Sequence, residues 1–208
     1  MNRLSSQNRI AFISSYPSKP GGHTAFAWCR VDRMSQSVRR CVEPVLIVLQ
    51  SDACEIHGEG IDFVIHKEII SDYMEAADFI NAGNIDHVEL ELEFRLLGGQ
   101  AGVGIDLLLR HLRIPVITTL HWIPENPSST YFQRFKDICD ASWKILVMSQ
   151  RGVELLRNTY GITDQKIEWV VSDLRDVSSE DERLFDDAAV EKRGEYSQKG
   201  FLCNEFYG

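Results

Sequence analysis

The residues of this sequence that could do chemistry stand just after short apolar runs. Gly21, Gly22 and His23 follow the apolar run at 9–15 and precede a helical pattern at 24–38. Glycines let the backbone approach a ligand closely, and the start of a helix offers free N–H groups and a positive dipole end. The segment therefore suits a phosphate or a sugar hydroxyl, and a tight turn between strand and helix is the alternative. Gly98 and Gly99 stand in the same kind of position before a second helical pattern.

Two titratable side chains, His121 and Glu93, stand where other apolar runs end. His121 closes the run at 115–121. It is the candidate catalytic residue, because a histidine can hydrogen-bond a substrate hydroxyl or titrate near neutrality. Glu93 lies near the end of the segment 86–94 and could accept a hydrogen bond from a sugar hydroxyl. The alternatives are a structural histidine that caps a strand and a solvated glutamate.

Several other kinds of site are disfavoured by what the sequence lacks. It has no GxGxxG dinucleotide fingerprint, no GxxxxGK[ST] phosphate loop and no GxSxG nucleophile turn. Its five cysteines are scattered without CxxC spacing, which argues against a zinc site or a disulfide framework. We therefore expect no metal site and no resident cofactor, and another class of Rossmann-like enzyme is the least favoured function.

Strand-like and helix-like segments must alternate to position these residues. This order indicates parallel βαβ units and an α/β fold with a doubly wound, mostly parallel, Rossmann-like sheet. Ligands of such sheets bind at the carboxyl ends of the strands, which points to the loops after them. The predicted strands are 9–15, 43–50, 61–66, 86–94, 115–121, 143–149 and 166–171, and the predicted helices are 24–38, 71–83, 102–113, 128–141 and 150–161.

Local signals refine two of these elements. Ser71 is predicted to cap the helix at 71–83 and Gly83 to end it. The segment 86–94, DHVELELEF, alternates between apolar and polar residues. Alternation is typical of a strand with one face less buried than the other.

Composition limits location, partners and domain organisation. The N-terminus MNRLSSQNRI has no apolar signal-peptide core, and no run of about 18 apolar residues could span a membrane. We predict a cytoplasmic protein with reduced thiols. The net charge of −9 disfavours nucleic acid as a partner. Residues 172–208 carry twice as many acidic as basic residues, so we place a boundary between a domain at 1–171 and an acidic linker or tail at 172–208.

Four segments, taken together and in order, resemble one family of enzymes. They are RIAFISSYPSKPGGHTAF, ELEFRLLGG, RIPVITTLH and ILVMSQRGVELLRNTYGITDQKI, and they extend over roughly residues 9–170. The chain resembles the N-terminal domain of the family 4 retaining glycosyltransferases, which have the GT-B fold. PVITTLH, followed by a helix and then VMSQRGVELL, is the most specific part of the likeness.

The resemblance implies transfer of a sugar from a nucleotide-diphosphate donor to an acceptor hydroxyl. It implies that this domain holds the acceptor and that a second, C-terminal domain holds the nucleotide sugar. Gly21 and Gly22 would then lie against the donor phosphates or the acceptor. His121 would face the reacting sugar, and Glu93 would lie on the acceptor side.

The chain also departs from the family pattern. Leu92 and Arg95 stand where the family often has the histidine and the glycine of Q-H-E-F-G, and Val171-Ser172-Asp173 stands in place of P-H-G. Only 37 residues follow position 171, so we expect a chain truncated before its donor domain and inactive or incomplete by itself. The alternative is a non-catalytic binding module with a protein partner on the cleft face. That face would expose Trp122, Ile123 and Phe201.

Overall fold

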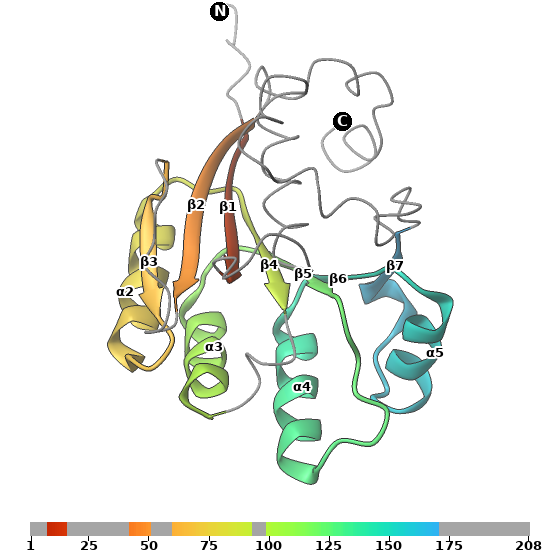
Figure 1. Ribbon diagram of the computed structural model, residues 1–208. Coiled ribbons are helices and arrows are strands. Elements are labelled where there is room, and N and C mark those ends of the chain that lie inside the picture. The colour runs from red at the N-terminus through yellow and green to blue at the C-terminus, as the bar shows by residue number, and fades with distance from the viewer. Residues whose placement is uncertain (1–7, 16–41, 51–59, 93–98, 171–208) are drawn as a thin grey trace, which may run out of the picture.

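The computed structural model describes residues 8–15, 42–50, 60–92 and 99–170. These residues form the predicted α/β fold, with seven parallel strands in one sheet (Figure 1). The strands are β1 Asn8–Ser15, β2 Val42–Gln50, β3 Phe63–His66, β4 His87–Leu92, β5 Val116–Leu120, β6 Lys144–Val147 and β7 Ile167–Trp169. The helices are α2 Ile70–Ala82, α3 Gly99–His111, α4 Ser129–Ala141 and α5 Gln150–Asn158, with a short 3₁₀ helix, η2, at Asp164–Lys166.

The strand order makes the sheet doubly wound. It runs β3-β2-β1-β4-β5-β6-β7, and every pairing is parallel. The chain moves outward from β1 to β3 on one side and from β4 to β7 on the other. The direction therefore reverses between the neighbouring strands β1 and β4, and this is where ligands of open α/β sheets bind.

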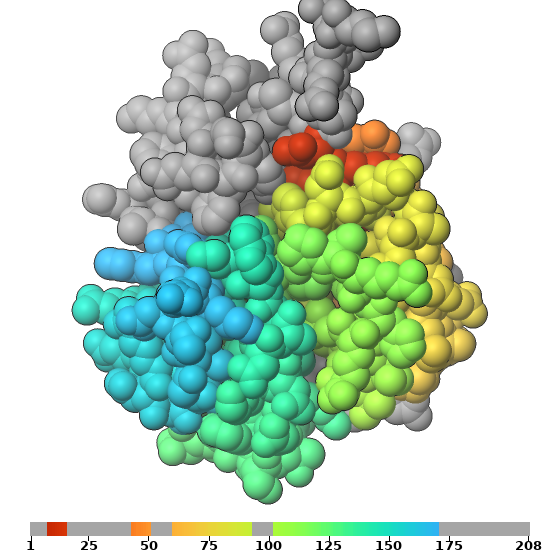
Figure 2. Space-filling view, turned by 180° about the vertical axis from the view of Figure 1, so that it is seen from behind, coloured from red at the N-terminus to blue at the C-terminus, as the bar shows by residue number. Residues whose placement is uncertain are grey.

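One face of the sheet carries the main hydrophobic core. Helices α2, α3 and α4 pack side by side over this face. Figure 2 shows this side, with the yellow, green and blue-green atoms of α2, α3 and α4 following one another across the surface. Ala11, Ile13, Val88 and Leu90 point from β1 and β4 into this core. The apolar runs of the sequence therefore became strands because each could bury one face against a helical layer.

Close packing between α2 and α3 depends on a glycine. A Cβ atom added at Gly104 would lie 2.3 Å from the ring of Tyr73, which is fully buried in α2. The absence of a side chain at Gly104 is what lets the aromatic ring enter the space between the two helices.

The sequence predicts one less buried face for β4, but in the structure both faces are buried. Successive side chains of a strand alternate between faces, so Glu89 and Glu91 lie opposite the core residues Val88 and Leu90. Both carboxyl side chains are nevertheless buried. The reason is tertiary, because β4 pairs with β1 on one edge and with β5 on the other and thus lies in the middle of the sheet.

The predicted cap of α2 is also wrong in detail. The helix begins at Ile70 with Ile69 as its N-cap, so Ser71 is already inside the first turn. Asp72 fixes this start, because its Oδ2 accepts hydrogen bonds from the backbone N–H and the ring Nδ1 of His66 at 3.0 and 2.7 Å. The helix does end at Gly83, its C-cap, while the positive φ of 51° falls on the next residue, Asn84.

The predicted helix at 24–38 and the segment 172–208 lie outside the described residues. None of the helices in the described part of the chain combines the length and the apolar character that crossing a bilayer requires.

Candidate functional site

A histidine and a glutamate meet at the carboxyl edge of the central strands. His121 follows β5 directly, and Glu91 is the penultimate residue of β4. The register pairs Glu91 with Thr119, and His121 lies two residues further along on the same face. His121 Nε2 and Glu91 Oε2 are 2.5 Å apart, and the two side chains are 3% and 8% exposed.

This pair fixes how the imidazole can act. A carboxylate only accepts hydrogen bonds, so the ring donates from Nε2 to Glu91. The pair therefore holds His121 in one orientation and one tautomer, as carboxylates do for histidines in many catalytic sites.

Sequence reasoning placed His121 at the end of its strand correctly but overlooked Glu91. The signal was present in the alternation of segment 86–94, which puts Glu89, Glu91 and Glu93 on one face of the strand. Which of these glutamates reaches His121 depends on the β4–β5 register, and a single sequence does not reveal that register.

A second buried contact of the same kind lies further back along β4. His87 Nε2 is 3.8 Å from Glu89 Oε1, and both side chains are largely buried. Each buried glutamate of this strand thus lies beside a histidine, as expected because an isolated buried charge is costly.

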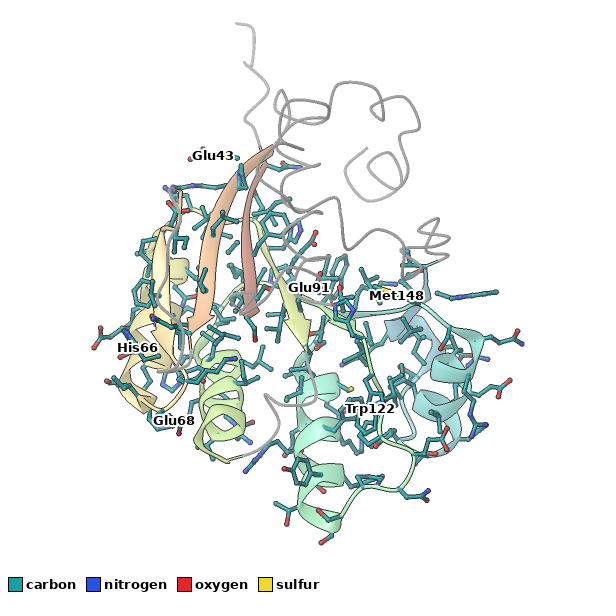
Figure 3. All side chains as sticks on the ribbon, in the orientation of Figure 1. Glu43, His66, Glu68, Glu91, Trp122 and Met148 are labelled. Atoms are coloured by element: carbon teal, nitrogen blue, oxygen red, sulfur yellow. The ribbon has the colours of Figure 1, made fainter. Side chains whose placement is uncertain are left out.

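A groove of about 820 Å³ lies beside the Glu91–His121 pair. Its size falls in the range of about 300–1,000 Å³ that is usual for small-molecule sites. Figure 3 labels Glu91, Trp122 and Met148, which come from β4, from the loop after β5 and from the position directly after β6. The groove is lined by residues 120–128, by Tyr131 of α4, by residues 147–149, and by Arg151, Gly152 and Leu155 of α5.

The wall formed by α5 is held close to the loop after β5. Ser149 caps this helix, because its Oγ accepts a hydrogen bond from the backbone N–H of Gly152 at 3.1 Å. A Cβ atom at Gly152 would lie 3.0 Å from Cδ1 of Ile123 and 3.2 Å from Ser149 Oγ. The glycine therefore permits the close approach that forms the inner end of the groove.

The loop after β5 is anchored by a buried tyrosine. The hydroxyl of Tyr160 donates a hydrogen bond to the carbonyl of Pro124 at 2.6 Å, and its ring stacks on Phe132 with centroids 5.0 Å apart. Burial raises the pKa of Tyr160 to about 12, so the phenol stays protonated and able to donate. These contacts pre-form the groove before any ligand binds.

The exposed side chains at the groove are partly as predicted. Trp122 is 48% exposed, but Ile123 is only 9% exposed because it packs against α5. Phe201 lies outside the described residues. At the rim, Arg151 Nη2 is 3.3 Å from Glu125 Oε1 and Arg151 Nη1 is 3.8 Å from Glu154 Oε2.

Of the other predicted site residues, the structure describes only Gly99. Gly99 is the first residue of α3. Gly21, Gly22, His23, Glu93 and Gly98 lie outside the described residues. Within the ranges that the structure covers, no cluster of three or more histidine, cysteine or acidic side chains is arranged to hold a metal ion.

Comparison with known proteins gives similarity in fold but not in sequence. No protein-family model matches this chain, and no curated protein matches it. A glycosyltransferase from Rickettsia africae ESF-5 superposes with a TM-score of 0.53 at 14% identity, over 79% of this chain and 43% of the other. The protein has a glycosyltransferase-like fold. It spans less than half the length of that relative, and at this identity the likeness concerns the fold alone.

Two further solved structures are similar at lower scores. An alpha-glucosyltransferase in complex with UDP and a 13-mer DNA has a TM-score of 0.47 at 13% identity, over 68% of this chain and 37% of the other. A sucrose-phosphate synthase from Thermosynechococcus elongatus has a TM-score of 0.46 at 12% identity, over 77% of this chain and 86% of the other.

Proposed function

We propose that this chain is the acceptor-binding half of a GT-B glycosyltransferase related to the retaining family 4 enzymes. The reaction would transfer a sugar from a nucleotide-diphosphate donor to an acceptor hydroxyl. The observation that carries the proposal is the buried Glu91–His121 pair, which stands beside a pre-formed groove at the carboxyl edge of the sheet. The glycosyltransferase-like fold supports it.

In this proposal His121 lies at the inner end of the acceptor site. Its side chain is only 3% exposed, so it would meet a ligand through a ring atom at the surface of the groove while Glu91 holds the ring. There the ring would contact the acceptor and so help to orient its hydroxyl for transfer. Gly21, Gly22, His23, Glu93, Gly98 and Gly99 are proposed to complete the substrate-binding surface.

The charge of the groove supports the proposal that this domain binds the acceptor and a second domain binds the donor. Departure of a nucleoside diphosphate needs positive groups aimed at its phosphates. Arg151 at the groove is already paired with Glu125 and Glu154. A donor-binding domain, on this polypeptide or on another, would therefore supply that charge, and we expect the chain by itself to transfer no sugar.

Calorimetry and complementation test this proposal. Titration of the chain with UDP- and GDP-sugars is expected to give no measurable heat, and tight nucleotide binding would contradict the acceptor-side assignment. Fusion of the chain to the C-terminal half of the Rickettsia glycosyltransferase is expected to restore transfer to a panel of saccharides. His121→Ala should abolish that transfer, whereas His111→Ala, an exposed histidine near the end of α3, should not.

A non-catalytic binding module is the second candidate, and the exposure of Trp122 beside the groove favours it. Such a module would bind its ligand or a protein partner with no nucleotide sugar present. Binding without any transfer in the fusion, with or without His121, would select this candidate.

A further inference from the structure

The groove displays an indole ring on a rigid loop. Trp122 is 48% exposed, although its neighbours on both sides are anchored. His121 is held by Glu91, and Pro124 is held by Tyr160. The exposure of Trp122 is therefore a property of a fixed loop. An aromatic side chain on an anchored loop presents contact area to a ligand at low cost in conformational entropy.

Polar side chains surround this aromatic surface. Glu125, Asn126 and Ser128 follow Trp122 on the same loop, and Ser149 faces them from the other wall of the groove. Carboxylate, amide and hydroxyl groups can each accept a hydrogen bond from a hydroxyl, and the amide and hydroxyl groups can also donate one. The groove thus combines an apolar platform with a rim that suits hydroxyl groups.

The charges at the groove argue against an anionic ligand. Arg151 has carboxylates on two sides, with Nη2 3.3 Å from Glu125 and Nη1 3.8 Å from Glu154. Ser149 Oγ also takes up one of the backbone N–H groups at the start of α5, that of Gly152, which could otherwise bind a phosphate. A phosphate or carboxylate placed here would meet Glu125 without a cation of its own.

We propose that this groove binds a neutral saccharide, with one ring stacked on Trp122 and its hydroxyls bonded to Glu125 and Asn126. A pyranose fits this chemistry, because it has an apolar face of C–H groups and a periphery of hydroxyls. The inference deepens the proposed function, on which it rests for the role of the saccharide as the acceptor. It adds the class of that acceptor, which is uncharged and neither a sugar phosphate nor a uronic acid.

Tryptophan fluorescence of the full chain tests the proposal directly. The probes are neutral trisaccharides and methyl glycosides of glucose, galactose and mannose, the corresponding 6-phosphates, and UDP. At least one neutral saccharide is expected to bind with a Kd below about 10 mM, and its phosphate at least about tenfold more weakly, which corresponds to about 1.4 kcal/mol.

Two tryptophan variants locate the site. Trp122→Ala is expected to weaken binding at least about tenfold. Trp143→Ala is the matched control, because Trp143 is also exposed but precedes β6 at the opposite edge of the sheet. Calorimetry with both variants separates loss of binding from loss of a fluorescent reporter, and circular dichroism confirms that both are folded.

Three results would overturn the inference. They are no binding of any neutral saccharide at about 10 mM, tighter binding of the phosphates or of UDP, and equal effects of the two tryptophan variants. The outcome is separable from that of the proposed function. Saccharide binding that depends on Trp122, without transfer in the fusion, would leave the inference standing and refute the enzyme. Transfer in the fusion that Trp122→Ala leaves unchanged would support the enzyme and refute the inference about the saccharide.

Discussion

The Glu91–His121 pair should be strongly coupled in its effect on stability. Its side chains are 8% and 3% exposed, so the magnitudes for buried pairs apply. Removing one partner leaves the other buried group without this hydrogen bond, which costs about 1–3 kcal/mol and more where the group left behind is a carboxylate. Replacing both partners by apolar residues of similar volume is often neutral or stabilising. Glu91→Met and His121→Phe should therefore each be destabilising, and the double variant should be far more stable than the sum predicts.

Urea unfolding followed by circular dichroism measures this coupling. A loss of about 3 kcal/mol is a large part of the 5–15 kcal/mol that stabilises a typical domain, so Glu91→Gln serves as a milder variant. Glu91→Gln removes the charge but keeps an oxygen that can accept from His121 Nε2–H. A shift in the midpoint with a constant m-value reports a true change in the free energy of unfolding.

An ion pair on the protein surface provides the control for this coupling energy. Lys136 Nζ and Asp140 Oδ2 lie 2.8 Å apart on α4, and both side chains are partly exposed. The coupling in that helical pair should be about 0.3–0.5 kcal/mol. The coupling between Glu91 and His121 should exceed about 1 kcal/mol. A value no larger than that of the surface pair would refute the view that the buried pair holds the edge of the groove.

Three further predictions follow from packing, titration and capping. Gly104→Ala should lower the free energy of unfolding by about 1–2 kcal/mol. The added Cβ atom would lie 2.3 Å from the buried ring of Tyr73, and this clash outweighs the gain of about 1 kcal/mol in helix propensity. An unchanged midpoint in urea unfolding would contradict this prediction. Burial raises the pKa of Cys139 and that of Tyr160 to about 12 each. In the unfolded chain these two groups ionise at lower pH, so the free energy of unfolding should fall from about pH 9 upward. Thermal melts at pH 7, 9 and 10.5 should show this fall. Constant melting temperatures would contradict burial as the cause of the two raised pKa values. Ser149→Ala should cost about 1 kcal/mol through loss of the α5 cap, while Ser128→Ala, whose side chain makes no cap hydrogen bond, should have a smaller effect in the same urea assay.

The sequence by itself determined the elements of this fold and the edge at which the site lies. Apolar runs, the alternating segment at 86–94 and the helical patterns between them predicted all seven strands and the four helices that the structure describes, within a few residues at each end. This worked because burial of a strand on both faces leaves a local apolar signature. The place of His121 at the end of β5 followed from the same local pattern.

The tertiary structure alone decided which side chains meet. It placed β4 between β1 and β5, so Glu91 became buried and reached His121, a contact that the sequence did not predict. The fold also buries Ile123 against Gly152 of α5 but leaves Trp122 exposed, although the two residues are adjacent and both apolar. Strand order, register and the approach of a helix to a loop are set by contacts between residues far apart in the chain. A local pattern carries no record of them, and for that reason the site had to be read from the folded molecule.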